Sequence, residues 1–381
     1  MKIDGAPRLS FLLAVHNDAR FVGATLGSIL GQTFGDFELV AVDDASTDGT
    51  ADLLRSTGDA RVRYVRNESN LGQVPSLNRG LKLCRGELVA RIDGDDLCEP
   101  DRLAAQVKYL ADHPDLAGCA TWTTEIDEND RVIGGVEPCP DPDYVRWSLC
   151  HTNWLYHPSM TLRRAVFEQA GGYDVAYPAC EDYELWTRLA AGGHRLGVVP
   201  RRLIRYRRRP GSLTATNADN QRRVGRQTAT RYIRALIGDP CDEQSVTLMR
   251  TLMSWQQLPS AERAAAGEPL DAGSGLITPA RAKAMVALMS LIRRATIAHA
   301  SAAARTAADA DVATHFLRRG RALLKDAPRV SAVLATYVAR LSHHRLSGVK
   351  LLISAARCTA GRWRRRNVAP SGTAPGLPDG R

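Results

Sequence analysis

The sequence has no C-x-x-C pair among its eight cysteines, and none of them stands at metal-ligand spacing from a histidine. We therefore expect ordinary thiols of a reducing cytoplasm, which excludes a disulfide framework and a zinc site. No apolar run reaches about 18 residues, so no membrane-spanning helix is predicted, and only attachment to a membrane surface stays open. The opening residues, MKIDGAPRLS, lack the successive regions of a signal peptide. No internal repeat stands out.

The charge is distributed unevenly along the 381 residues, a length that suits two modest domains or one large domain. Residues 1–220 hold 25 Lys and Arg against 31 Asp and Glu, whereas residues 221–381 hold 26 against 10. The acidic part is the better place for a cation site. The basic part suits a partner that carries phosphate, either lipid headgroups or another polyanion.

One stretch, ELVARIDGDDLCEPD, combines a short apolar run with a cluster of acidic residues. The apolar run 88–92 predicts a buried strand, and it ends directly in the carboxylates of Asp93, Asp95 and Asp96. Carboxylates packed this closely raise each other's pKa unless a cation lies among them, and a hard divalent ion prefers oxygen ligands. The alternative is a solvated acidic turn, which an isolated D-x-D does not exclude.

Strands and helices alternate before this stretch. Strands are predicted at 9–15, 37–42, 62–65 and 88–92, with helices at 21–31, 51–55, 75–83 and 101–112. Short links between such elements are typical of right-handed crossovers and a parallel sheet. Ligands of these sheets bind beyond the carboxyl ends of the strands, where His16, the pair Asp43 and Asp44, and the pair Asp93 and Asp95 all fall. A nucleotide pocket is the favoured interpretation.

The remaining segments predict an α/β domain followed by a helical one. A strand at 116–124, a hairpin turn at 127–135, a helix at 144–149, a helix at 181–191 and an extended segment at 195–206 complete residues 1–220. Residues 221–366 are expected to form a basic helical region, in which apolar side chains at helical spacing favour core contacts. Residues 367–381 are rich in Pro, Gly and Ser, and disorder is predicted for them.

Five segments give the chain a family resemblance. They are SFLLAVHNDARFVGATLGSILGQTFGDFELVAVDDASTDGT, NLGQVPSLNRGL, RGELVARIDGDD with EPDRL, HPSMTLRR with GGYD, and CEDYELWTRLA. In this order, over about residues 9–215, the chain resembles glycosyltransferase family 2. The resemblance implies the GT-A fold, a mostly parallel Rossmann-like sheet flanked by helices, and an inverting transfer of sugar from a nucleotide-diphosphate sugar.

The resemblance also implies roles for the residues at the strand ends. Val15 and His16 would line the base pocket, Asp44 would accept from a uracil-type base edge, and Asp43 would support it. The family commonly has a tyrosine where this chain has His16, which bears on the identity of the base. Two basic residues, Arg79 and Arg91, are candidates to meet the diphosphate, and a surface or structural role is the alternative for each.

The metal and catalytic roles follow from the same resemblance. Asp93 and Asp95 would hold Mg²⁺ or Mn²⁺ against the donor phosphates, and Asp182 would act as the general base. The helix macrodipole alone also explains acidic residues in a first helical turn. Contacts with the acceptor or the donor sugar are expected for Asp96, Trp154, His157 and Glu181. The alternative for Asp96 is to support the metal ligands from behind, and the alternative for Trp154 and His157 is a core role.

A basic cluster, Arg205, Arg207, Arg208 and Arg209 with Ser212, lies where related enzymes close a loop over the donor. One or two of these arginines are expected to pair with phosphate and the others to form a solvated strand end. The resemblance implies a UDP-sugar donor and a carbohydrate or lipid-linked glycan acceptor for a cell-surface or secreted glycan. Together with the cysteines and the basic region, this predicts a cytoplasmic protein, peripheral at the inner face of an anionic membrane.

Two other functions are weighed against this one. Nucleotidyl transfer on a similar sheet would need a glycine-rich loop with a lysine after the first strand, and residues 14–21 contain neither. A membrane-surface or nucleic-acid adaptor with a vestigial nucleotide fold would rest on the basic region, where the arginines around Trp363 suit an interfacial anchor. No nucleic-acid partner is expected if the chain is a transferase.

Overall fold

The computed structural model describes residues 5–212, 217–238, 241–253, 278–297, 300–322 and 328–341. The described residues of 1–250 and 288–308 form one unit, and those of 251–287 and 309–381 form a second. The predicted tail 367–381 and the anchor around Trp363 lie outside the described residues. Of the helices within the described ranges, none is long and apolar enough to cross a membrane.

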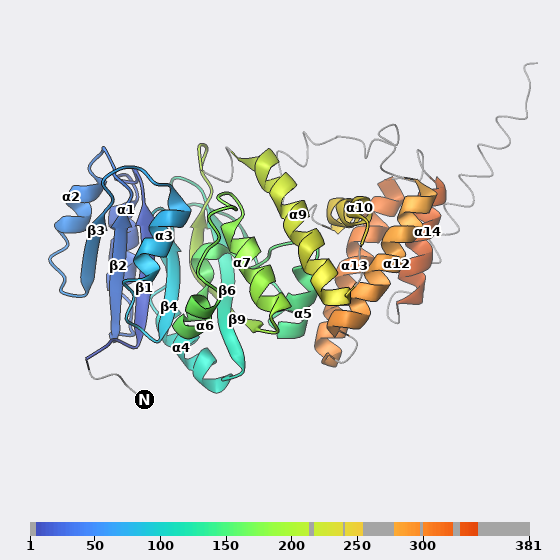
Figure 1. The fold of residues 1–381 in the computed structure, drawn as a ribbon, viewed down its shortest axis with the longest axis horizontal. Helices are drawn as coiled ribbons and strands as arrows, with labels where there is room; N and C mark the ends of the chain where they lie inside the picture. The colour runs from blue at the N-terminus through green and yellow to red at the C-terminus, as the bar shows by residue number, and fades with distance from the viewer. Residues whose placement is uncertain are drawn as a thin grey trace, which may run out of the picture. The chain divides into compact units, whose positions relative to one another are not determined.

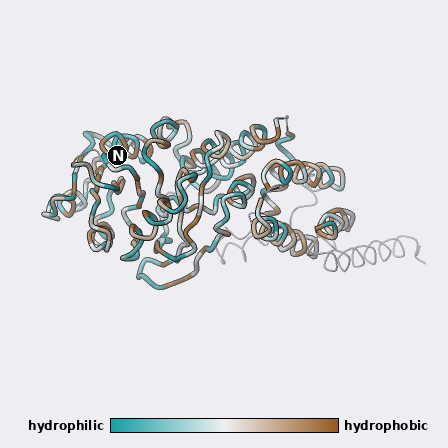
Figure 2. Tube along the Cα trace, turned by 90° about the horizontal axis from the view of Figure 1, so that it is seen from below, coloured by the Kyte–Doolittle hydropathy of each residue, from teal (hydrophilic) through white to brown (hydrophobic). Residues whose placement is uncertain are grey.

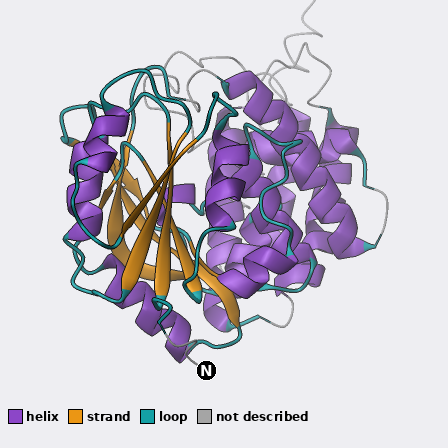
Figure 3. Cartoon of the chain, turned by 60° about the vertical axis from the view of Figure 1, so that its left-hand side comes forward, coloured by secondary structure: helices purple, strands orange, loops and turns teal. Residues whose placement is uncertain are grey.

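The first unit is built on one mixed sheet with helices on both sides (Figures 1 and 3). Its strands are β1 (Leu9–Val15), β2 (Phe37–Asp43), β3 (Val62–Arg66), β4 (Leu88–Asp93), β5 (Leu97–Cys98), β6 (Leu116–Ile126), β7 (Val132–Val136), β8 (Thr161–Arg163) and β9 (Arg195–Arg207). They are ordered β3-β2-β1-β4-β8-β6-β9-β5, and β7 pairs with β6. The sheet confirms the predicted α/β class.

The helices interrupt the strands much as the sequence predicts. In the first unit they are α1 (Val22–Leu30), α2 (Thr50–Arg55), α3 (Gln73–Leu81), α4 (Arg102–Asp112), α5 (Pro142–Ser148), the 3-10 helix η1 (His157–Ser159), α6 (Arg164–Gln169), α7 (Glu181–Ala191) and α9 (Ala218–Ile237). Helix α10 (Glu243–Met253), α12 (Pro279–Ile297) and α13 (Ala302–Ala322) have residues in both units, and α14 (Pro328–Arg340) belongs to the second.

The strands β1 to β4 pair in parallel, and helices connect them along the chain. Strand β2, FELVAVD, is buried at every position. One face packs Phe11 against Phe37, whose ring centroids lie 5.7 Å apart. On the other face α3 approaches closely at Gly80, where a Cβ atom would lie 2.4 Å from Leu12 Cδ1. A larger residue would push α3 off the sheet.

The second half of the sheet departs from the purely parallel arrangement. Strand β8 runs antiparallel to β4 and β6, and β5 runs antiparallel to β9, while β6 and β9 are parallel. The prediction of a hairpin turn at 127–135 was only partly correct, because β7 already begins at Val132 and pairs with β6. The turn itself is confined to residues 127–131, between β6 and β7.

The helices beyond residue 217 bury the apolar side chains that the sequence places at helical spacing. On α12 these are Met285, Leu288, Met289 and Ile292, and near α14 they are Leu334, Tyr337, Val338 and Leu341. Along the helices of Figure 2 brown and teal alternate, as expected for helices with one buried side. The interpretation of these residues as core contacts is therefore confirmed. Within the first unit, Arg231 of α9 donates to Glu184 of α7 at 2.5 Å.

Candidate functional site

The ends of β1, β2 and β4 lie at one level of the sheet. The strand register pairs Val15 with Asp43, and it pairs Ala14 with Asp93. The polar residues that follow these strands therefore share one edge, as the sequence predicts for a parallel sheet. The candidate site is built at this edge, and the N-terminus of α7 supplies a further pair of carboxylates.

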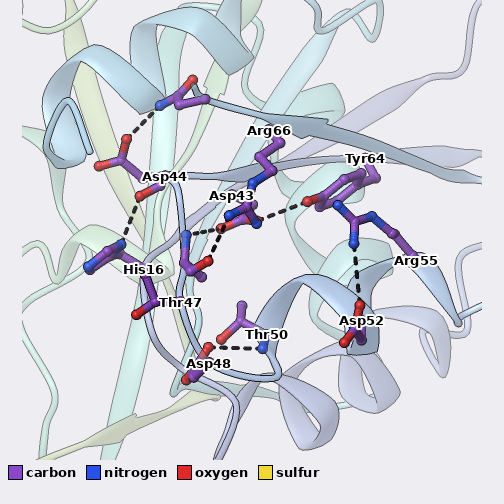
Figure 4. Close-up of polar contacts among 12 residues, drawn as sticks. His16, Asp43, Asp44, Thr47, Asp48, Thr50, Asp52, Arg55, Tyr64 and Arg66 are labelled. Atoms are coloured by element: carbon purple, nitrogen blue, oxygen red, sulfur yellow. Dashed lines mark hydrogen bonds and ion pairs between the residues drawn. The ribbon is translucent and has the colours of Figure 1, made fainter. Parts of the chain in front are cut away.

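Asp43 and Asp44 are both bound by groups of the protein (Figure 4). The Asp43 carboxylate is fully buried and accepts from Tyr64 Oη at 2.9 Å and from Arg66 Nη1 at 2.5 Å. Burial opposes its ionisation, but hydrogen bonds, first from Ser46, outweigh it and lower the pKa of Asp43. Asp43 thus fixes the turn after β2, and its support of a base contact by Asp44 stays a prediction.

The Asp44 carboxylate organises the loop before α3. It accepts from Asn67 Nδ2 at 2.6 Å and from the backbone N–H groups of Leu71 and Gly72 at 2.9 and 2.8 Å. Gly72 has a φ of 90°, which favours glycine at this position. Arg79, a candidate for the diphosphate, binds the end of β3 and this loop, because its Nη1 donates to the Arg66 carbonyl at 2.9 Å and to Asn67 Oδ1.

His16 lies exposed at the edge of the sheet, while Val15 beside it is buried. The Nδ1 atom of His16 donates to the Asp44 carbonyl oxygen, which lies 2.7 Å away. In Figure 4 this contact joins the ends of β1 and β2. The ring is held in place while keeping exposed surface, so it is available to a planar ligand. Its assignment to a base pocket stays a prediction.

The end of β4 and the turn after it, residues 93–96, form an acidic loop with three carboxylates in different environments. The side chain of Asp93 is 25% exposed and that of Asp95 is 14% exposed. Asp96 is fully buried, and its Oδ1 accepts from the Arg207 backbone N–H at 2.7 Å. Burial and then the charge of Asp95 raise the pKa of Asp96 well above its ordinary value. In this structure Asp96 offers no side-chain surface to a sugar, so it supports the loop from within.

A carboxylate that the sequence did not single out joins this loop. Asp18, just after β1, lies so close to Gly94 that a Cβ on the glycine would be 2.9 Å from Asp18 Oδ2. Burial and then Asp95 raise the pKa of Asp18 to about 6, while Arg209 opposes the shift. Burial and then Asp93 also raise the pKa of Asp95. The carboxylates of Asp18, Asp93 and Asp95 therefore repel one another at this edge. A positive charge among them relieves this repulsion.

The four arginines of the basic cluster have different partners, and the expected solvated strand end fits Arg205 best. Arg207 is buried, and its Nε donates to the Asp95 carbonyl at 2.7 Å. Arg208 pairs with Glu125 of β6. Arg209 donates from Nε to Asp95 Oδ2 at 2.6 Å and from Nη2 to Asp18 Oδ1 at 2.8 Å. Arg205 is the most exposed of the four and pairs with Glu99.

A buried polar network links the acidic loop to the start of α7. Arg91 is 3% exposed and forms an ion pair with Asp93, two residues further along β4. The Gln73 amide is best oriented with its oxygen accepting from Arg91 Nη2 at 2.7 Å and its nitrogen donating to Glu181 Oε1 at 3.3 Å. Arg91 thus lies beneath the site, where it joins Asp93 to Glu181, and not at the open edge expected for a diphosphate contact.

Glu181 and Asp182 open α7 and have perturbed ionisation. Burial raises the pKa of Glu181 to about 7. Burial, followed by the Glu181 charge, also raises the pKa of Asp182 above its ordinary value. Asp182 is partly exposed, and its Oδ2 accepts from Asn153 Nδ2 at 2.8 Å. Asp182 is therefore held in a fixed orientation with its basicity increased, which are two properties of a general base.

The two aromatic candidates differ in their exposure. His157 is buried, its Nε2 lies 2.6 Å from Tyr173 Oη, and burial lowers its pKa to about 3. It is a neutral core residue in this structure and offers little surface to a sugar. Trp154 is half-buried, and its indole N–H has no hydrogen-bond partner among the described residues. Its predicted sugar contact stays a prediction.

A divalent cation has a suitable pair of ligands at this edge. Within the described ranges no group of three or more His, Cys, Asp or Glu residues is arranged to hold a metal ion. Asp93 and Asp95 nevertheless supply two partly exposed carboxylates that repel each other. Mg²⁺ is commonly bound by one or two carboxylates, with substrate phosphates and water completing its coordination. The residues present fit such an ion.

Known glycosyltransferases are similar to this chain in sequence. The Glycosyl transferase family 2 model matches residues 10–171, which include the acidic loop and stop before Glu181. The O-antigen biosynthesis glycosyltransferase WbnJ of Escherichia coli is 30% identical over 48% of this chain and 71% of its own. An uncharacterized glycosyltransferase of Methanocaldococcus jannaschii is 26% identical over 53% of this chain and 71% of its own.

The fold extends the similarity beyond the matched residues. The crystal structure of S. aureus TarS 1-349 in complex with UDP-GlcNAc aligns with a TM-score of 0.53 and 16% identity, over 87% of this chain and 91% of that one. At this identity the likeness concerns the fold alone, which is that of a GT-A type glycosyltransferase. The sequence matches establish that the chain belongs to glycosyltransferase family 2.

Proposed function

We propose that this chain is a metal-dependent, inverting glycosyltransferase that moves a sugar from a UDP-linked donor to a hydroxyl group of a glycan acceptor. The observation that carries the proposal is the link between two acidic groups through the interior. Asp93, at the end of β4, is joined by Arg91 and Gln73 to Glu181, which adjoins Asp182 on α7. A cation-binding edge and a candidate base thus belong to one polar network.

The relatives support the substrate classes in this proposal. WfaP of Escherichia coli, 24% identical over 54% of this chain, is named a UDP-Glc:alpha-D-GlcNAc-diphosphoundecaprenol beta-1,3-glucosyltransferase. ExoO of Rhizobium meliloti, 28% identical, is a succinoglycan biosynthesis protein. We therefore propose a UDP-sugar as donor and a carbohydrate or lipid-linked acceptor in polysaccharide biosynthesis. A cytoplasmic location at an anionic membrane surface, where a lipid-linked acceptor lies, is part of the same proposal.

At the donor side, Asp93 and Asp95 would hold Mg²⁺ or Mn²⁺, which as a Lewis acid stabilises the negative charge of a departing diphosphate. His16, Val15 and the Asp44 turn would receive the base. The residues that bind the loop from behind keep this edge rigid, because Arg207 joins Asp95 and Asp96 to the end of β9. Rigidity favours catalysis, since a small misplacement of reacting groups is costly.

At the acceptor side, Asp182 would remove the proton from the attacking hydroxyl. Asn153 fixes one carboxylate oxygen of Asp182, and the raised pKa makes the carboxylate a stronger base than an ordinary aspartate. The hydroxyl oxygen forms a bond to the anomeric carbon while the bond to the diphosphate breaks on the opposite side. The configuration inverts because one displacement takes place, and Asp182 retains the proton.

A panel of nucleotide-sugars tests the proposal directly. Each is added to the full-length protein with and without Mn²⁺, and the melting temperature is measured. A donor present at 100 times its Kd stabilises the folded protein by about 2.7 kcal/mol. We expect a UDP-sugar to raise the melting temperature more with Mn²⁺ than without, and Asp95→Ala to remove the difference. Equal melting temperatures for every nucleotide-sugar, together with no release of UDP, would reject the proposal.

A further inference from the structure

Arg209 occupies a position between two carboxylates that come from distant parts of the chain. Its guanidinium donates to Asp95 at 2.6 Å and to Asp18 at 2.8 Å. It also lies over the ring of Phe21, with 5.4 Å from Cζ to the ring centroid. The three partners belong to the loop after β4, the loop after β1 and the residue before α1. The Arg209 guanidinium therefore bridges two of the carboxylates that converge at this edge.

Arg207, two residues before Arg209, makes a different set of contacts. The side chain of Arg207 is 2% exposed and binds the carbonyl oxygens of Asp95 and Asp127 as well as the Asp130 carboxylate. Contacts of this kind fix the backbone of two loops, so Arg207 is structural. The side chain of Arg209 is 27% exposed, and its hydrogen bonds among the described residues go to two carboxylate groups only. Such a side chain can change partners without unfolding a loop.

We propose that Arg209 is a positioning residue whose guanidinium occupies the cation's position beside Asp95 in the ligand-free protein. When the divalent cation binds, Arg209 gives up its bond to Asp95 and keeps only its bond to Asp18. The inference rests on the proposed cation at Asp93 and Asp95. The guanidinium relieves the repulsion among Asp18, Asp93 and Asp95 in the ligand-free protein. When Asp95 is taken by the cation, the bond to Asp18 keeps Arg209 at the same edge, where its freed N–H groups face an anionic donor.

This arrangement has a consequence that a simple structural ion pair does not share. A guanidinium and a divalent cation that need the same carboxylate oxygen compete with each other. Removing Arg209 should therefore strengthen the binding of the cation alone, although it removes a phosphate-binding group and should weaken turnover of the donor. Asp18→Asn should weaken cation binding, because it removes a nearby negative charge and leaves Arg209 with Asp95 as its only carboxylate partner.

The test is a titration of the full-length protein with Mn²⁺ alone. The electron paramagnetic resonance signal of the free ion measures how much Mn²⁺ is bound. We expect Arg209→Gln to bind Mn²⁺ roughly 3- to 5-fold more tightly than the wild type, the upper part of the range for an exposed ion pair. Arg195→Gln is the matched control, because it removes the same charge from the opposite end of β9, where Arg195 pairs with Asp115. Its affinity should stay within about twofold of the wild type.

Arg209→Lys guards against a glutamine variant that fails to fold. Lysine keeps the charge but lacks the fork that bridges two carboxylates, so an intermediate gain in Mn²⁺ affinity is expected. Unchanged or weaker Mn²⁺ binding in both Arg209 variants, or no binding in any of the proteins, would overturn the inference. Sugar transfer by the wild type is measured separately. If the Arg209 variants bind Mn²⁺ more tightly but the wild type transfers no sugar, the role of Arg209 is kept and the proposed function is rejected. If the wild type transfers sugar but the Arg209 variants bind Mn²⁺ with unchanged affinity, the proposed function is kept and the role of Arg209 is rejected.

Discussion

Arg91 and Asp93 lie two residues apart on the same side of β4 and form an ion pair beneath the candidate site. Alternation along a strand places Leu88, Ala90 and Ile92 on the opposite side, in the hydrophobic core. The Arg91 side chain is almost fully buried, so the pair contributes to the interior and to the edge of the sheet at once. A substitution at Arg91 or at Asp93 should therefore affect the interior packing as well as the edge of the sheet.

Replacing Arg91 should therefore destabilise the protein as well as inactivate it. In Arg91→Met the carboxylates of Asp93 and Glu181 lose their shared buried cation, and breaking such a pair typically costs about 3–5 kcal/mol. We expect the free energy of unfolding, measured by urea titration, to fall by about 3 kcal/mol. Arg201→Met is the control, because Arg201 is 53% exposed in its pair with Asp101 and should cost at most about 1 kcal/mol. Equal losses in the two variants would show that Arg91 is not a buried counter-ion.

Glu181 should give the stability of the protein an unusual dependence on pH. Its pKa rises from 4.5 in the unfolded chain to about 7 in the folded protein, so between these values the folded state binds more protons. Stability contributed by this group is present below about pH 4.5, falls as the pH rises through that window, and is lost above about pH 7. A shift of this size corresponds to about 3 kcal/mol.

The isosteric variant Glu181→Gln separates this contribution from those of other groups. Its stability should decline less between pH 5 and pH 7 than that of the wild type, because the amide does not titrate. Thermal melting of both proteins across this range measures the difference. Parallel pH profiles for the two proteins would mean that Glu181 ionises normally.

The sequence predicts the strand ends well because they depend on local patterns. Apolar runs that stop at acidic turns place β1, β2 and β4, and parallel crossovers then bring His16, Asp43 and Asp93 to one edge. Burial is harder to predict, since nothing in the residues adjoining Asp96 and His157 marks these two polar side chains as interior. The structure places both in the interior, where Asp96 binds the end of β9 and His157 packs beside Tyr173.

The partners of Arg209 lay beyond the reach of sequence patterns. Asp18 and Arg209 are 191 residues apart, and only the packing of the end of β9 beside β6 and β5 brings them together. A run of three arginines also suggests uniform exposure. In the folded chain successive residues of that run point to different carboxylates, because side chains alternate along an extended segment. The structure therefore supplies the pairing that the basic run alone does not.

Gly94 should be essential to the geometry of the acidic loop. A Cβ atom there would lie 2.6 Å from Val15 Cγ1 and 2.9 Å from Asp18 Oδ2, so Gly94→Ala must displace Asp18 or the loop. We expect kcat/KM for sugar transfer to fall by about 10- to 100-fold, since a shift of about 1 Å can cost two orders of magnitude. Gly27→Ala is the control, because a Cβ atom at this position of α1 would meet no packing neighbour within 4 Å among the described residues, and alanine favours the helix. Full activity in Gly94→Ala would show that the loop tolerates the displacement.

Asp182 should be the residue whose loss affects chemistry without affecting donor binding. Asp182→Asn keeps the size of the side chain but removes the base, and general bases contribute about 10²- to 10⁴-fold to rate. We expect kcat to fall by that factor while the stabilisation by a UDP-sugar with Mn²⁺ is kept. Asp52→Asn, at a side chain that is 85% exposed, is the matched control and should leave kcat unchanged.

The pH dependence of the same reaction distinguishes a base from a residue that only shapes the site. Because burial and Glu181 raise the pKa of Asp182, the wild type should lose activity on the acid side at a higher pH than an ordinary aspartate would give. In Asp182→Asn the residual activity should lack this acid limb. A variant that is slow but keeps the wild-type acid limb would assign the titrating group elsewhere, and Glu181→Gln would then be the variant expected to remove it.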